Sequence, residues 1–314
     1  MTEKQGKITA GLGGLFEVRC PEPDGSVTRY SLRAKGILRR TEEDRLLVGD
    51  NVLVTTAENA PDERVISALL ARKNALIRPP VANLDLLFVI LAARSPDPVF
   101  STADKLISIA EYHSIAPVVV VTKADLSPDT AEEVARVYRT AGFPVFVTSR
   151  KTGDGLAALH DYVANEVRGG RTAAFAGASG VGKSTLMNAL FPALALPTGE
   201  VSRKTERGRH TTRAVELYET TLGAPDTGFL ADTPGFSLLD FERFDFFPAE
   251  ALPATFREFA PYLGACRYAD CTHTGEGETD CAVARAAAEG KIPPSRLSSY
   301  RDLFRTLKNK NPYK

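Results

Sequence analysis

The sequence predicts a multidomain chain made of an N-terminal β-barrel, a central α/β domain and a small α-helical C-terminal domain. Three observations support this division. Short segments of alternating polarity fill residues 1–72, apolar runs alternate with helical stretches within residues 73–240, and residues 241–314 are mainly helical with a loop rich in cysteine. At 314 residues the chain is also long enough for two or three compact units.

The composition predicts a globular protein. Hydrophobic residues make up 43% and charged residues 25% of the chain, without low-complexity tracts. The longest apolar run, residues 84–93, contains Asp85 and is too short to cross a bilayer. Residues 1–14 lack the long apolar core of a signal peptide. We therefore expect a cytoplasmic protein that has no membrane partner and acts as a monomer.

Residues 1–72 have the pattern of a small all-β domain. Segments with alternating side-chain polarity are broken by Gly, Pro and Asp. These segments are residues 7–9, 15–18, 27–32 and 51–54. Periodicity alone does not separate a barrel from a sandwich, but the length suits a five-stranded barrel of the OB type.

The central part alternates buried strands with helices. Apolar runs without polar alternation are separated by helical stretches of ten or more residues. The runs are residues 86–91, 117–121, 143–147 and 173–176, and the helical stretches are residues 103–113, 130–140 and 156–167. This pattern predicts βαβ units and a parallel sheet that is covered on both faces.

A phosphate-binding loop follows the fourth of these runs. The pattern G-x-x-x-x-G-K-[ST] is met in full, after a predicted strand at residues 172–176 and before a predicted helix at residues 184–190. We expect Lys183 to reach the β- and γ-phosphates and the Ser184 hydroxyl to bind Mg²⁺. The strand and helix argue against a chance glycine-rich turn. The expected nucleotide-binding residues here are Gly177, Ala178, Ser179, Gly180, Val181, Gly182, Lys183, Ser184 and Thr185.

The sequence Asp-Thr-Pro-Gly at residues 232–235 follows a short apolar run, residues 229–231. A carboxylate at this strand end suits the Mg²⁺ shell, so Asp232 is the expected group, and Gly235 would donate its N–H to the γ-phosphate. Alone the motif is compatible with a simple turn. About 50 residues after a phosphate loop, it indicates a GTPase switch.

The polar stretch 197–213 lies between the two motifs and is typical of a switch loop. Thr211 and Thr212 each carry a hydroxyl suited to closing over Mg²⁺, and we favour Thr212. The alternative is that one or both are ordinary threonines at the start of a strand.

A guanine-reading motif is expected at Thr122, Lys123, Ala124 and Asp125, at the end of the strand 117–121. The Asp125 carboxylate matches the two donors on the guanine edge, which adenine lacks. The next strand leads to Ser149, which we expect in a second guanine-contacting loop. This motif precedes Lys183 by about sixty residues, the reverse of the usual order, so the domain is circularly permuted. Because of the permutation, the segment after Asp232 leads directly into the C-terminal domain. A switch in this segment could therefore move that domain.

A cluster of metal-ligand residues lies in the C-terminal part. Cys266, Cys271, His273 and Cys281 supply three thiolates and one imidazole, a complete set for a tetrahedral structural Zn²⁺ site. The alternative is a group of reduced cysteines around a core histidine. Cys20 stands alone and is expected to be a small buried residue.

The formal net charge is zero, yet basic residues gather in two places. Residues 291–314 hold seven Lys or Arg against one acidic residue, Asp302, and residues 203–213 hold five against one. Such runs are usually solvated faces, but they also suit contact with nucleic-acid phosphates.

Together these motifs resemble the RsgA family of GTPases, which depend on the small ribosomal subunit, and the resemblance covers nearly the whole chain. The segment 72–85 is similar to that family's joint between barrel and GTPase domain. Val48, Gly49 and Asp50 are similar to the end of its barrel motif. The permuted motif order and the loop of three cysteines and one histidine complete the resemblance.

This resemblance implies an OB-fold domain at residues 1–72, a circularly permuted GTPase domain at 73–240 and a zinc-binding helical domain at 241–314. It implies a GTPase that binds the small (30S) ribosomal subunit and its rRNA and hydrolyses GTP, stimulated by that subunit, in its late maturation. The implied cofactors are GTP or GDP, Mg²⁺ and one structural Zn²⁺. The alternatives are an rRNA-docking nucleotide switch with little hydrolysis, and a P-loop ATPase or kinase.

Two positions depart from the common GTPase pattern. Thr122 stands where many GTPases carry asparagine, and Phe236 stands where others carry the glutamine that orients water. The catalytic group therefore lies elsewhere or comes from the partner. His210 is our candidate for positioning the attacking water, with Thr212 beside Mg²⁺, and a solvated loop histidine is the alternative for His210.

Overall fold

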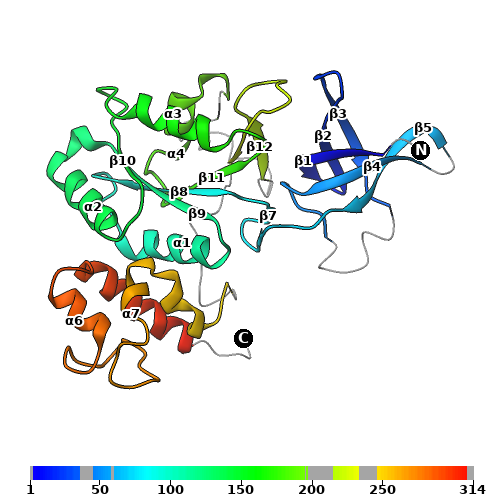
Figure 1. Ribbon diagram of the computed structural model, residues 1–314. Coiled ribbons are helices and arrows are strands. Elements are labelled where there is room, and N and C mark those ends of the chain that lie inside the picture. The colour runs from blue at the N-terminus through cyan, green and yellow to red at the C-terminus, as the bar shows by residue number, and fades with distance from the viewer. Residues whose placement is uncertain are drawn as a thin grey trace. The chain divides into compact units, whose positions relative to one another are not determined.

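A computed structural model describes residues 3–35, 45–57, 60–194, 196, 215–232 and 246–309. His210, Thr211, Thr212 and Gly235 lie outside these described residues. The chain divides into two compact units, shown as ribbons in Figure 1. The first comprises Met1–Asp85, His160–Phe175 and Glu200–Phe236, and the second comprises Leu86–Leu159, Ala176–Gly199 and Ser237–Lys314. The two domain boundaries predicted after residues 72 and 240 stay a prediction.

The N-terminal residues form the expected five-stranded barrel. Its strands are β1 (Lys4–Leu12), β2 (Leu15–Pro21), β3 (Val27–Arg33), β4 (Asn51–Ala57) and β5 (Ala60–Leu69). Strand β1 pairs with β2 and β4, β2 pairs with β3, and β4 pairs with β5. A parallel bridge between Ala34 and Ile66 joins the end of β3 to β5 and closes the ring. The strand order β1-β2-β3-β5-β4 is that of an OB-type barrel.

The barrel core consists of β-branched side chains that point inward from successive strands. Ile8, Val18, Val52, Val54 and Ile66 are fully buried. The sequence analysis did not expect β5, because its first half, Ala-Pro-Asp-Glu-Arg, lacks the apolar alternation of a half-buried strand.

The first unit also contains β12, β13 and the first four residues of β11 from the middle of the chain. Strand β11 (Thr172–Gly177) runs parallel to β13 (Phe229–Asp232), and β13 pairs antiparallel with β12 (Glu216–Glu219). On its other side β12 pairs with barrel strand β1. A short hairpin, β6 (Ala75–Leu76) and β7 (Val81–Ala82), follows the barrel. The barrel and these strands therefore form one continuous sheet within this unit.

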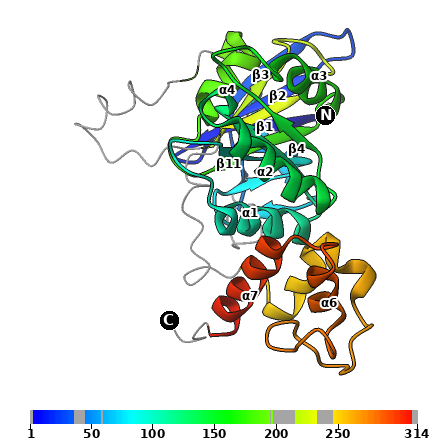
Figure 2. The ribbon, with the colours of Figure 1, turned by 90° about the vertical axis from the view of Figure 1, so that its left-hand side faces the viewer.

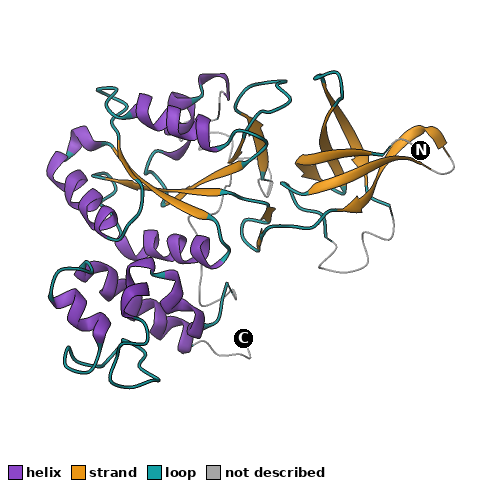
Figure 3. Cartoon of the chain, viewed as in Figure 1, coloured by secondary structure: helices purple, strands orange, loops and turns teal. Residues whose placement is uncertain are grey.

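The second unit is built on parallel strands in the order β10-β9-β8. These are β8 (Leu86–Ala92), β9 (Ala116–Thr122) and β10 (Val145–Val147). Every residue of β8 is buried, as expected of a parallel strand covered on both faces. Helix α1 (Phe100–Tyr112) packs against β8 and β9, and α2 (Pro128–Thr140) packs against β9 and β10. Figure 3 shows this alternation of strands and helices, which confirms the predicted βαβ pattern.

Two further helices and two short 3₁₀ turns precede the C-terminal region. Helix α3 (Leu156–Glu166) begins in the second unit and ends in the first, and α4 (Lys183–Leu190) follows β11. Short 3₁₀ turns lie at Ala124–Leu126 and Pro192–Leu194.

The C-terminal region is helical, as the sequence predicts. Two 3₁₀ segments, η4 (Ala249–Thr255) and η5 (Arg257–Tyr262), precede α6 (Ala282–Ala288) and α7 (Pro294–Lys308). Figure 2 shows α7 beside α1, and the two helices are in contact. Helix α7 buries its apolar residues. These are Leu297, Tyr300, Leu303, Phe304 and Leu307.

A buried ion cluster joins α7 to the rest of its unit. The Arg296 side chain is fully buried and donates to Asp104 of α1 and Glu258 of η5, each at 2.6 Å. The Tyr138 hydroxyl of α2 donates to the same Asp104 oxygen at 2.9 Å. Arg296 belongs to the basic run expected to meet rRNA phosphates, and that expectation is wrong for this residue because its charge is used inside the fold.

Among the described residues, no helix combines the length and the apolar character needed to span a membrane.

Replacing Arg296 by leucine should destabilise the protein by about 3–5 kcal/mol, because Asp104 and Glu258 would stay buried without their cation. Urea unfolding followed by circular dichroism measures this change. The matched control is Arg305→Ala on the same helix, which removes an exposed pair with Asp302 and should cost about 0–1 kcal/mol. Equal midpoints for the two variants would contradict the structural role of Arg296.

Candidate functional site

The predicted phosphate loop occupies the turn between β11 and α4. Gly177 adopts a positive φ of 153°, and a Cβ there would clash with the Ile90 carbonyl oxygen. Only glycine fits so close to the neighbouring strand. Gly182 adopts φ 96° at the N-cap of α4 and provides no side-chain cap. The first N–H groups of this helix therefore stay available for an anion such as a phosphate.

The Lys183 side chain bends back over the loop. Its Nζ donates to the carbonyl oxygens of Gly177 and Ala178, each at 2.9 Å. These contacts hold the ammonium group above the loop, at the place where a phosphate on the loop would need its charge. A cavity of about 110 Å³ lies beside the loop, with Val99 and Leu106 among its apolar walls.

The predicted guanine motif is bonded directly to the phosphate loop. The Thr122 hydroxyl donates to the Val181 carbonyl at 2.6 Å, and the Lys123 Nζ donates to the Gly180 carbonyl at 2.8 Å. Threonine thus provides an anchor at the position where many GTPases carry asparagine. The two motifs, which lie far apart in the sequence, form one site in the second unit.

Asp125 lies at the edge of this site and is supported by Ser149. The Ser149 hydroxyl donates to one Asp125 carboxylate oxygen at 2.6 Å, and Ser149 itself is buried. Its oxygen also accepts from the Thr152 N–H at 3.2 Å. The sequence predicts Ser149 only as part of a second guanine-contacting loop. The structure shows that its side chain orients the carboxylate of Asp125, the predicted base-reading group.

The sequence analysis missed one part of the site, the loop between β8 and α1. The Lys123 Nζ also donates to the Ser95 carbonyl, and Ser95 adopts φ 55°. Pro96 approaches the phosphate loop, because a Cβ at Gly180 would lie 3.7 Å from its ring. The signal was a Pro-rich turn after a buried strand at the same edge of the parallel sheet.

Of the predicted switch residues, the structure places one by its backbone. Asp232 is the last residue of β13, and Thr172 and Ala174 of the parallel strand β11 pair with Phe229 and Ala231. The carboxyl ends of these two strands therefore share one edge of the sheet. The predicted contacts of Thr212, Gly235 and His210 lie outside the described residues.

The four predicted metal ligands converge. The His273 Nδ1 lies 3.5 Å from the Cys266 sulfur and 3.4 Å from the sulfurs of Cys271 and Cys281. The sulfurs of Cys266 and Cys281 are 4.0 Å apart, and all four ligand atoms lie within 4.8 Å of one another.

These distances fit a tetrahedral ion. Bonds of about 2.3 Å to sulfur and about 2.0 Å to nitrogen place sulfur and nitrogen about 3.5 Å apart, and two sulfurs about 3.8 Å apart. The Cys266 sulfur also accepts from the Ala282 N–H and the Cys281 sulfur from the Ala284 N–H, each at 3.3 Å. Such N–H donors stabilise metal-bound thiolates.

The loop that carries the cluster is fastened to α7. The Tyr300 hydroxyl donates to the Thr272 carbonyl at 2.7 Å, and Arg301 Nε donates to the His273 carbonyl at 3.3 Å. Burial raises the pKa of the Cys271 thiol to about 12 and lowers the pKa of His273. The raised pKa means that ionising the buried thiol costs free energy, and a bound cation would offset this cost.

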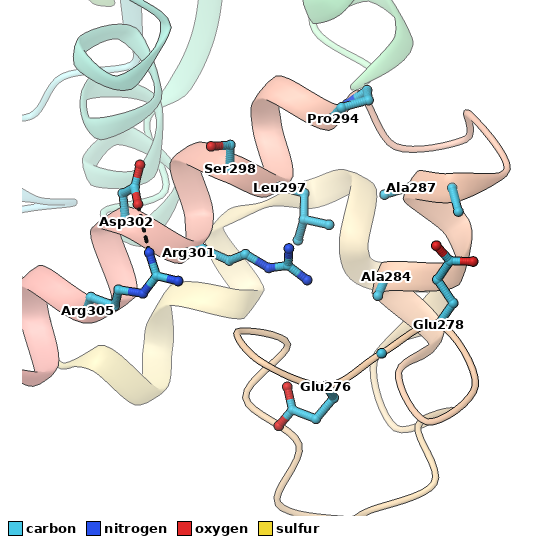
Figure 4. A pocket seen from close by; sticks show the side chains of 12 residues that line it. Glu276, Glu278, Ala284, Ala287, Pro294, Leu297, Ser298, Arg301, Asp302 and Arg305 are labelled. Atoms are coloured by element: carbon cyan, nitrogen blue, oxygen red, sulfur yellow. Dashed lines mark hydrogen bonds and ion pairs between the residues drawn. The ribbon is translucent and has the colours of Figure 1, made fainter.

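A hollow of about 630 Å³ lies between this loop, α6 and α7 (Figure 4). Its walls include Glu276 and Glu278 of the loop and Arg301 and Arg305 of α7. No residue predicted to bind nucleotide or metal lines it. The hollow is therefore separate from both candidate sites.

Comparisons with known proteins agree with this arrangement. Residues 69–242 match the family model described as RsgA GTPase. The small ribosomal subunit biogenesis GTPase RsgA of Agathobacter rectalis is 36% identical over 98% of this chain and 99% of its own length. The protein of the same name from Moorella thermoacetica is 39% identical over 94% of each chain.

Two solved structures share the fold over almost the full length. The crystal structure of YjeQ from Thermotoga maritima is 29% identical, with a TM-score of 0.79, over 99% of this chain and 100% of that one. The crystal structure of YloQ, a circularly permuted GTPase, is 31% identical, with a TM-score of 0.76, over 100% of this chain and 98% of that one. The chain belongs to the RsgA GTPase family.

Proposed function

We propose that this protein binds guanine nucleotides and hydrolyses GTP on the small ribosomal subunit during the late maturation of that subunit. One observation carries the nucleotide part of this proposal. Thr122 and Lys123 are bonded to the phosphate loop, and Asp125 is oriented by Ser149 beside them. The partner is supported by relatives named small ribosomal subunit biogenesis GTPases that match over nearly the whole chain.

The proposed binding mode divides the nucleotide between two groups of residues. Asp125 reads the guanine edge, and the N–H groups at the start of α4 bind the phosphates together with Lys183. Bound Mg²⁺, held by Ser184 and Thr212, would neutralise charge that develops on the phosphate oxygens. Asp232 at the end of β13 would support that shell, and Gly235 would bind the γ-phosphate.

Activation of the attacking water is proposed to involve His210 or a group from the partner. Phe236 replaces the glutamine that orients water in other GTPases, and the phosphate-loop lysine is used for charge. The site therefore needs a water-positioning group from the partner or from its own switch loop. We expect GTP hydrolysis to be slow without the subunit.

The rRNA contact is proposed to include exposed basic residues. Arg305 and Lys308 lie on the exposed side of α7, whereas Arg296 is committed to its buried pairs. The second basic run, residues 203–213, lies outside the described residues. We further propose a cytoplasmic monomer with three domains at residues 1–72, 73–240 and 241–314.

The small subunit should accelerate GTP turnover at least about tenfold, a modest part of the roughly 10³- to 10⁵-fold that partner-supplied groups give other GTPases. Phosphate release is measured for the full chain alone, with small subunits, and with large subunits as the control. Lys183→Ala should abolish the stimulated rate. Negligible turnover that the small subunit leaves unchanged would contradict hydrolysis and favour a nucleotide-dependent docking protein.

The Cys266, Cys271, His273 and Cys281 cluster is proposed to bind one structural Zn²⁺. We expect one zinc per chain by mass spectrometry of the purified protein and loss of that zinc in Cys271→Ser. The thermal unfolding midpoint should fall with it, because zinc binding and folding are coupled. The matched control is Cys20→Ala, a buried cysteine in the barrel, which should keep the metal. Protein purified anaerobically without zinc would refute the site.

A further inference from the structure

Within the first unit the barrel is joined to β12 and β13, the strands that lead to Asp232. Ala10 of β1 pairs with Glu216 of β12, and Glu216 pairs in turn with Asp232 of β13. One strand therefore separates the barrel from the residue proposed to support Mg²⁺. A displacement of β1 can therefore reach Asp232 through backbone pairing alone.

Side chains reinforce the joint at the other end of β12. Glu219 is 4% exposed, and one of its oxygens accepts from Arg19 Nε at 2.9 Å and from Arg29 Nη2 at 2.6 Å. The second oxygen accepts from the Gly223 N–H at 2.7 Å. Arg19 is equally buried and also donates to the Ala224 carbonyl. One carboxylate thus holds two barrel arginines and the turn that connects β12 to β13.

Two barrel residues, Lys7 and Arg19, contact the start of β13. Glu219 pairs directly with Phe229, a buried residue three positions before Asp232. The Arg19 guanidinium lies 5.5 Å and the Lys7 Nζ 5.1 Å from the centroid of the Phe229 ring. Two barrel cations therefore pack on the first residue of this strand.

Lys7 extends the joint to the strand that enters the phosphate loop. Its Nζ donates to the Thr172 hydroxyl of β11 at 3.2 Å, five positions before Gly177. Burial lowers the pKa of Lys7 to about 8, while the nearby Asp85 carboxylate opposes this shift. Burying the Lys7 ammonium group costs free energy, so its position against Thr172 indicates a specific contact between the barrel and the sheet.

We propose that Glu219 is a positioning residue that couples docking of the barrel to the placement of Asp232, the residue proposed to support Mg²⁺. Barrels of the OB type bind nucleic acid, which makes this barrel a suitable surface for the subunit. When the barrel is engaged, Glu219 with its two arginines fixes β12 and β13, and with them Asp232. The inference rests on the proposed stimulation by the small subunit.

The test compares Glu219→Gln with the wild type in GTP turnover, with and without small subunits. The subunit-stimulated kcat should fall roughly fivefold or more, the lower end of typical coupling between sites, while unstimulated turnover and GDP affinity change less than about twofold. Arg29→Gln, at a partly exposed position that tolerates substitution, should give the same loss. The double variant should be no worse than the more impaired single variant, because both act through one contact.

The matched control is Glu22→Gln, which removes the ion pair with Lys4 inside the barrel and does not involve β12. It should keep the stimulated rate. A stimulated wild type with unchanged Glu219→Gln and Arg29→Gln variants would overturn the coupling alone. A wild type that the subunit does not stimulate would overturn the proposed function and the coupling with it. Equal losses in Glu22→Gln and Glu219→Gln would reduce Glu219 to a general stabilising role and overturn the inference.

Discussion

The contact on which the nucleotide site depends is the pair of hydrogen bonds from Thr122 and Lys123 to carbonyls of the phosphate loop. A phosphate loop alone binds any nucleoside triphosphate. Once it is fastened to the strand end that carries Asp125, the distance between base and phosphates is set by the protein. Leaving the buried Val181 carbonyl unpaired would cost about 1–3 kcal/mol, so the bond also fixes the loop. Selectivity for the base and binding of the phosphates thereby depend on the same pair of hydrogen bonds.

The C-terminal helices and the barrel are each joined to their own unit by a buried ion pair. The C-terminal helices are bound to α1 through Arg296 and its two buried carboxylates, a contact that is costly to break. The barrel joins β12 and β13 through backbone pairing, the buried ion pair of Arg19 with Glu219, and the partly exposed Arg29. The strands that lead to Asp232 are thus fixed to the barrel.

Much of this arrangement could be predicted from sequence, since its signals are local. The glycines of the phosphate loop, the alternation of buried strands and helices, and the spacing of Cys266 to Cys281 each have one dominant physical interpretation. What could not be predicted depends on distant partners. Nothing local marks Arg296 as buried, Ser95 as a partner of Lys123, or Glu219 as the acceptor for two barrel arginines. Strand β5 was missed because its polar first half is held by pairing with β4 rather than by its own apolar pattern.

The central claim is that Asp125 makes this a guanine site, and calorimetry of GDP and ADP binding tests it most directly. Wild-type protein should bind GDP and show no measurable preference for ADP. Asp125→Asn should weaken GDP binding about 10- to 150-fold, the value of a hydrogen bond to a charged group. The control Asp129→Asn, an exposed aspartate on the adjacent helix α2, should bind GDP as the wild type does. Preference of the wild type for ADP, or an Asp125→Asn variant with undiminished GDP affinity, would contradict the account.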